Sequence, residues 1–108
     1  MPQAHMPVVR HGHLQVTTAA PIALDSEDWF TWLITATHFC FWFSPLYRLT
    51  VRKEKRRHQE YWYAYLKYDR KLHNVYLGKP QQLTNERLEA ACQTIWQRIR
   101  QAKVRSMM

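Results

Sequence analysis

The segment RKEKRRHQEYWYAYLKY, residues 52–68, decides the fold because two patterns meet in it. Its first part is a run of cations, and its second part is a run in which apolar and phenolic side chains alternate. Successive side chains of an extended chain point to opposite sides, so a period of two predicts a β-strand from about Tyr61 to Tyr68. One side of this strand is apolar and carries Trp62, Ala64 and Leu66. The other side carries phenols and a cation: Tyr61, Tyr63, Tyr65 and Lys67.

Neighbouring segments supply strands that can pair with this one. The period is also two from Phe39 to Phe43, before a Ser44-Pro45 turn, and again from about Arg48 to Arg56. A further alternation from His73 to Leu77 ends at Gly78. Because short polar turns separate the last three of these segments, we expect a three- to four-stranded antiparallel sheet.

Two amphipathic segments predict helices, one before the sheet and one after it. Asp25 or Ser26 can cap a helix that runs to about Thr37, and Thr84 is the expected N-cap of the second helix. The apolar residues of the second helix recur at helical spacing: Leu88, Ala91, Cys92, Ile95 and Ile99. The predicted fold class is α+β: a three- to four-stranded antiparallel sheet packed against a C-terminal amphipathic helix, with a short preceding helix.

The length of 108 residues has room for one domain and little else. We expect a single α+β domain over residues 25–103. Residues 1–24 contain prolines and show no periodicity, which predicts a flexible N-terminal arm. Residues 104–108 are expected to fray as a C-terminal end.

The charge is unevenly distributed. Sixteen Lys and Arg oppose eight Asp and Glu, giving a net charge of +8. Residues 48–79 hold ten of these cations and three of the acids, so +7 of the +8 lies in that range. A concentration of positive charge indicates a polyanionic partner such as nucleic acid, although a plain solvated surface is the alternative.

Several function classes lack their sequence signals. There is no glycine-rich phosphate loop and no nucleophile in a recognisable setting, so we expect no enzymatic activity and no cofactor. Cys40 and Cys92 do not have a zinc-binding spacing, and they are expected to be buried thiols in a reducing cytoplasm. Residues 29–43 are apolar but shorter than the ~20 residues that span a bilayer, and we expect neither a membrane segment nor a metal site.

A single helix covers only one face of the sheet, so the alternation leaves a basic and phenol-rich face exposed. The major groove of DNA admits strands as well as helices, and Arg48 or Arg52 could pair with guanine there and Asn74 with adenine. Cations on hairpin loops and strand ends would contact phosphates. The predicted nucleic-acid-binding residues are Arg48, Arg52, Lys53, Lys55, Arg56, Arg57, Tyr63, Tyr65, Lys67, Arg70, Lys71, Asn74, Tyr76 and Lys79.

The run YWYAYLKYDRKLHNVYLGKPQQLTNERLEAA, residues 61–91, resembles the arm-type DNA-binding domain at the N-terminus of tyrosine recombinases, the integrases of phages and transposons. That resemblance implies a three-stranded antiparallel sheet that enters the major groove and is backed by a C-terminal helix. It also implies that the sheet positions facing DNA are Arg52, Tyr63, Tyr65, Asn74 and Tyr76. Residues 49–65 are similar to small modules of bacterial proteins, some of them attached to large transcriptional regulators. No catalytic recombinase domain follows, so integration chemistry is not implied.

Three alternatives remain open at this level. Exposed tyrosines and basic loops also suit RNA, although duplex DNA is favoured over RNA. The aromatic residues Trp29, Phe30 and Trp32 could instead dock a protein partner, since aromatic anchors dominate interface energies. Tyr61, Tyr63 and Tyr65 could also pack beneath the first helix or the N-terminal arm, in which case the face is part of the core.

Overall fold

The computed structural model describes residues 6–16, 19–44 and 47–107. Within these residues the chain forms seven strands, two α-helices and one short 3-10 helix. In chain order they are β1 (Val8–Arg10), β2 (His13–Gln15), β3 (Ile22–Ala23), α1 (Glu27–Thr35), β4 (His38–Ser44), β5 (Tyr47–Arg56), β6 (Gln59–Tyr68), β7 (Lys71–Gly78), η1 (Pro80–Gln82) and α2 (Asn85–Met107).

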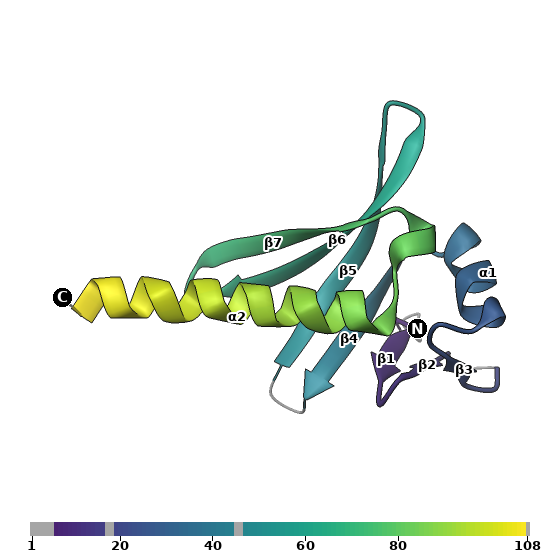
Figure 1. Cartoon of the computed structure of the whole chain (residues 1–108), viewed down its shortest axis with the longest axis horizontal. Helices are drawn as coiled ribbons and strands as arrows, with labels where there is room; N and C mark the ends of the chain where they lie inside the picture. Colours follow the sequence, from purple (N-terminus) through teal and green to yellow (C-terminus); the bar gives the residue numbers. More distant parts are fainter. Residues whose placement is uncertain (1–5, 17–18, 45–46, 108) are drawn as a thin grey trace, which may run out of the picture.

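All seven strands belong to one sheet, in the order β3-β2-β1-β4-β5-β6-β7. Every neighbouring pair is antiparallel except β1 and β4, which are parallel. The long helix α2 lies across one face of this sheet and α1 lies at its β3 end (Figure 1). The α+β class and the C-terminal helix are confirmed, whereas the sheet is mixed and larger than the three to four strands expected.

The flexible arm expected over residues 1–24 is wrong for the part that the structure describes. Val9 and Leu14 are fully buried, and the strands that carry them extend the sheet beyond β4. His11 and Gly12 form a two-residue turn between these strands, with φ of 55° and 75°. Strands of two or three residues are too short to produce a period in the sequence, which is why none was found. Residues 1–5 and 17–18 lie outside the described part.

The C-terminal end that is expected to fray, residues 104–108, continues helix α2 as far as residue 107. Helix α2 continues through Met107, and its last turns contain neither Gly nor Pro to end it. Thr84 Oγ1 accepts a hydrogen bond from Arg87 N at 3.2 Å, so the predicted N-cap is confirmed. All members of the predicted apolar stripe are buried: Leu88, Ala91, Cys92, Ile95 and Ile99. Met108 lies outside the described part.

Tight hairpins join β5 to β6 and β6 to β7. Arg57 and His58 have φ of 50° and 72°, and Asp69 and Arg70 have φ of 52° and 65°. Positive φ at both central residues is the type I′ turn, whose twist matches that of the paired strands. The short polar turns expected between these strands are therefore two-residue turns.

The β5–β6 hairpin extends beyond its neighbours. Strand β4 pairs with β5 only as far as Arg52, and β7 pairs with β6 only from Trp62. Residues 53–61 therefore form a two-stranded ribbon that projects from the sheet, as Figure 1 shows for the teal hairpin. We call these residues the projecting ribbon.

The aromatic residues of α1 belong to the core. Trp29 is fully buried, and its Nε1 donates a hydrogen bond to Leu83 O at 2.8 Å. Its ring stacks on Trp32 at 5.7 Å and meets the edge of Phe39 at 5.5 Å. Asp25 Oδ1 accepts a hydrogen bond from Asn85 N, which joins the start of α1 to the start of α2. Trp29 is therefore a core residue, and Trp32 is only partly buried against the same core.

Burial also determines the protonation state of the Cys92 thiol. The side chain lies in the core beneath α2, and this desolvation raises the pKa of Cys92 to about 11. A buried thiolate would lose its hydration without gaining a partner, so the thiol stays protonated at neutral pH. Cys92 is therefore an inert core residue.

Lys53, on β5, caps the C-terminal end of α1. Its ammonium donates to Leu33 O at 2.7 Å and to Ile34 O at 2.9 Å, two carbonyls in the last turn of that helix, and lies 3.7 Å from Glu60. Only 5% of its side chain is exposed. A cation at a helix C-terminus satisfies free carbonyls and complements the helix dipole. Lys53 is thus a structural residue, which corrects its prediction as a nucleic-acid contact.

We expect Lys53→Met to lower the free energy of unfolding by about 1–2 kcal/mol, because it keeps the apolar stem but leaves two carbonyls without their donor. Lys55→Met is the matched control, because Lys55 is exposed two residues further along the same strand and should change stability by less than about 0.5 kcal/mol. Urea denaturation of both variants makes the comparison. Equal stability of the two would contradict the capping role.

Candidate functional site

The two faces of the sheet differ because side chains alternate along each strand. In β5, Leu49 and Val51 are buried in the core with α2, whereas Arg48, Thr50 and Arg52 point the other way. Both described helices contribute their buried residues to the single core on the first side. We call the second side the open face, since no described helix packs on it. Its members include Trp42, Arg48, Thr50, Arg52, Glu54, Arg56, Tyr61, Tyr63, Tyr65, Lys67, Leu72, Asn74 and Tyr76.

The tyrosines of the open face form one continuous group of rings. The ring centroids of Tyr63 and Tyr76 are 5.5 Å apart, those of Tyr61 and Tyr76 5.9 Å, and those of Tyr63 and Tyr65 6.4 Å. Tyr76 is 48% exposed, and the other three are half-buried against one another. The aromatic rings of α1 pack on Phe39 from the core side instead. The alternative in which the tyrosines lie beneath α1 is therefore wrong.

Glu54 links the tyrosines to the cations of the projecting ribbon. Its carboxylate accepts a hydrogen bond from the Tyr65 hydroxyl and another from Arg56 Nη2, the latter at 3.1 Å. The Arg56 guanidinium also lies over the Tyr63 ring, 5.1 Å from its centroid. The hydrogen bond to Glu54 raises the pKa of Arg56, so this guanidinium keeps its charge throughout the physiological range. We call Glu54, Arg56, Tyr63 and Tyr65 the Glu54 cluster.

A second cation–aromatic group lies at the other end of the open face. The guanidinium carbons of Arg10 and Arg48 are 5.3 Å and 4.3 Å from the Trp42 ring centroid. Strand β4, which carries Trp42, lies between β1 and β5, so the two arginines flank the indole from opposite sides. The indole Nε1 lies 3.1 Å from Cys40 Sγ, and burial raises the pKa of that thiol. We call Arg10, Trp42 and Arg48 the Trp42 cluster.

Sequence reasoning missed part of this second cluster. Arg10 lies in the segment for which the sequence predicts a flexible arm, and Trp42 lies in a segment whose alternation predicts only a strand. The available signal was the alternation itself, because Trp42 falls on the side opposite to Phe39 and Phe41, which are both buried. Nothing in the sequence indicated that Arg10 would lie beside it.

Eight of the predicted site residues lie on the open face. The register of β5, β6 and β7 places them there together, and none of the eight is fully buried. They are Arg48, Arg52, Arg56, Tyr63, Tyr65, Lys67, Asn74 and Tyr76.

The remaining predicted cations are spread over other surfaces. Lys55 pairs with Glu60 in the register of the projecting ribbon and lies on the side opposite to Arg56. Lys71 falls on the α2 side of β7, and Lys79 precedes η1. Arg57 and Arg70 occupy the turns at the two ends of β6. The expectation that all these cations surround one face is corrected, because alternation divides a run of adjacent cations between two sides.

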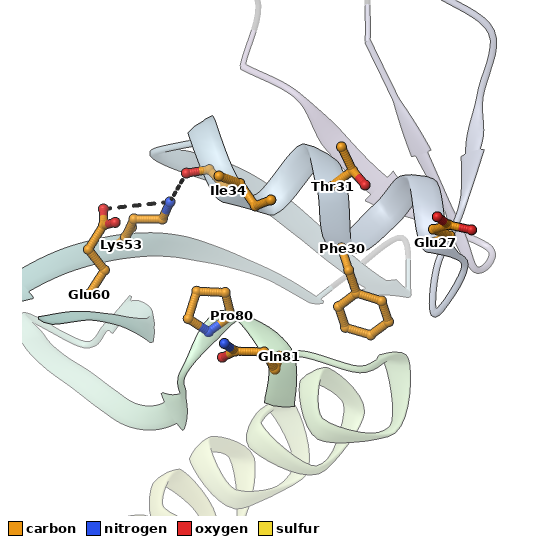
Figure 2. Close-up of a pocket in the computed structure, with 8 residues that line it drawn as sticks. All are labelled: Glu27, Phe30, Thr31, Ile34, Lys53, Glu60, Pro80 and Gln81. Atoms are coloured by element: carbon orange, nitrogen blue, oxygen red, sulfur yellow. Dashed lines mark hydrogen bonds and ion pairs between the residues drawn. The ribbon is translucent and has the colours of Figure 1, made fainter.

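A separate cleft of about 530 Å³ lies between α1, η1 and the base of the projecting ribbon. Figure 2 shows Phe30, Ile34 and Pro80 around it, with Lys53 and Glu60 at one end. Ile34 is 66% exposed, so part of the lining is apolar and accessible. Of the three aromatic residues predicted as protein anchors, Phe30 alone lines this cleft.

Comparison of the chain with protein-family models, with curated proteins and with solved structures found no match. The described residues contain no group of three or more His, Cys, Asp or Glu placed to bind a metal ion. Across the same residues, neither helix has the combination of length and apolar character that crossing a membrane requires. The open face and its two clusters are therefore the basis for a functional proposal.

The two arginines of the Trp42 cluster should make the indole of Trp42 more accessible to anions than to cations. Because two guanidiniums flank Trp42, iodide should quench a fraction of the tryptophan fluorescence that caesium leaves unquenched. Trp42→Phe should remove that fraction, and Arg48→Gln should reduce it, whereas the fully buried Trp29 and Trp62 respond to neither ion. Steady-state quenching titrations measure this. Equal quenching of the unsubstituted protein by iodide and caesium would count against the geometry.

Proposed function

We propose that this protein binds nucleic acid through the open face and the projecting ribbon, with duplex DNA as the favoured ligand. Its role would be that of a regulator or an accessory factor in DNA transactions. The observation that carries the proposal is the alternation of β5 and β6, which leaves phenols and cations on a face that no described helix covers. The proposed compartment is the cytoplasm, because both cysteines are free thiols.

The charges and rings of this face match the two parts of a nucleic acid. Exposed arginines such as Arg52 and Arg56 can contact phosphate oxygens with forked hydrogen bonds. The half-buried tyrosine rings offer apolar surface and hydroxyls to sugars and base edges. Asn74 is exposed on the same face and carries the amide that fits adenine. The one acid of the Glu54 cluster is already occupied by Arg56 and Tyr65, so its charge is largely compensated.

The shape favours a duplex of the B form. The major groove of B-DNA is about 12 Å wide and admits a two-stranded ribbon, which is the form of residues 53–61. The major groove of A-form RNA is too narrow for side chains to read. The tyrosine rings also pack on one another, which leaves less free ring surface for stacking with single bases. The resemblance to the arm-type domain of tyrosine recombinases agrees with this choice of ligand.

Salt dependence tests the proposal directly. Affinity for random-sequence duplex DNA should fall steeply between about 50 mM and about 200 mM salt, because each phosphate contact adds about 0.9 to the logarithmic slope. Arg52→Gln should lower that slope by about 0.9. Arg100→Gln is the matched control, because Arg100 is exposed on α2 and lies off the open face, and it should leave the slope unchanged. Fluorescence anisotropy with labelled duplexes gives both quantities.

Two outcomes of that experiment would overturn the proposal or part of it. Binding that does not depend on salt, or that weakens equally in Arg52→Gln and Arg100→Gln, would remove the open face as the interface. Tighter binding of a single-stranded or duplex RNA of equal length at equal salt would show that RNA and not DNA is the ligand. The open face would remain the proposed interface.

A further inference from the structure

We propose that the Trp42 cluster is a second phosphate-binding end of the open face, so that one duplex is held at both ends of β5. This inference rests on the proposed function and adds Arg10 and Trp42 to the residues involved. At one end of β5 the duplex would meet the Glu54 cluster, and at the other end it would meet Arg10 and Arg48. The ligand is the sugar–phosphate backbone of a duplex.

The Trp42 cluster holds two positive charges close together, and no acid of the described residues pairs with either of them. Both guanidinium carbons approach the same ring, so they lie within roughly 10 Å of each other, where like charges still repel. Within the described residues neither arginine forms an ion pair, and the recorded side-chain hydrogen bond of Arg10 goes to the neutral amide of Gln15. An anion bound between the two would relieve this repulsion.

Stacking on the indole prepares both arginines for such an anion. A guanidinium over an aromatic ring keeps its N–H groups at the edge of its plane, where they remain available to phosphate oxygens. The ring also restricts the long side chain, so less rotamer entropy is lost when a ligand binds. The Glu54 cluster holds Arg56 over Tyr63 in a comparable way, with Glu54 as an additional partner.

The separation of the two clusters selects a long and rigid ligand. Arg48 and Arg56 are eight residues apart on one strand, which corresponds to about 26 Å at about 3.3 Å per residue. A DNA strand places one phosphate about every 3.4 Å along the axis, so both ends are reached by a duplex of roughly eight base pairs. A single phosphate or a short oligonucleotide cannot occupy both.

Duplex length therefore tests the inference. The ligands are fluorescein-labelled hairpin stems of about 6 and about 12 base pairs, one too short to reach both clusters and one long enough. The variant is Arg10→Gln/Arg48→Gln, and the matched control is Arg100→Gln/Lys103→Gln, which removes the same charge from α2. Arg48→Gln alone and a urea denaturation of every variant guard against a loss of folding at β1.

We expect Arg10→Gln/Arg48→Gln to lower affinity for the long stem by about tenfold and its salt slope by about 1.8, because two phosphate contacts are lost. Affinity for the short stem should fall by no more than about twofold, since the other cluster still binds it. The control should retain both affinities within about twofold, because α2 lies on the covered side of the sheet. The affinity of Arg48→Gln for the long stem should lie between that of the double variant and that of the control.

The possible failures separate the two proposals. If the unsubstituted protein binds both stems but the open-face double variant behaves like the control, the second end is disproved and the proposed function stands. An equal loss of affinity for both stems would show that the two clusters do not act on one duplex, which also disproves it. If the unsubstituted protein binds neither stem, both the proposed function and this inference fail.

Discussion

The register between β5 and β6 is the constraint on which the rest of the structure depends. Val51 pairs with Ala64 and Lys53 with Trp62, and the type I′ turn at Arg57 and His58 fixes that alignment. Because side chains alternate, a shift of one residue would expose Trp62 and bury the tyrosines. The fully buried Trp62 and Ala64 make such a shift costly, since their apolar area would return to water. The core and the open face are therefore two consequences of one alignment.

The same alignment explains why a basic run in the sequence does not become one basic patch. Arg52 and Arg56 point to the open face, whereas Lys53 and Lys55, between them, point to the other side. Lys53 is then close enough to α1 to end that helix, which gives it a structural role. The fold thus uses part of the basic run for stability and leaves the rest for a ligand.

Local patterns were sufficient to predict the parts of the fold that are long and regular. Strands β4 to β7 and helix α2 follow from periods of two and of 3.6 residues, and Thr84 and Ser26 have the capping contacts that their residue types indicate. Strands β1 to β3 could not be predicted in this way, because they are only two or three residues long and β1 is held by a parallel pairing with the distant β4. The same non-local pairing places Arg10 beside Trp42. The position of Arg10 therefore could not be predicted from local patterns, whereas the alternation within β4 was sufficient to place Trp42 on the open face.

The two clusters of the open face differ in a way that bears on how a ligand would lie. In the Glu54 cluster the carboxylate balances the charge of Arg56 and fixes its side chain, so that end offers a positioned guanidinium with a weaker field. The Trp42 cluster has two guanidiniums and no ion pair within the described residues, so its field is stronger but its side chains are held only by stacking and by Gln15. A strong field attracts a polyanion from a distance, whereas fixed donors discriminate between orientations at contact. The face is therefore electrostatically asymmetric along β5. The phosphate backbone of a duplex looks the same when the duplex is reversed, so a preferred direction on this face would have to come from contacts with bases.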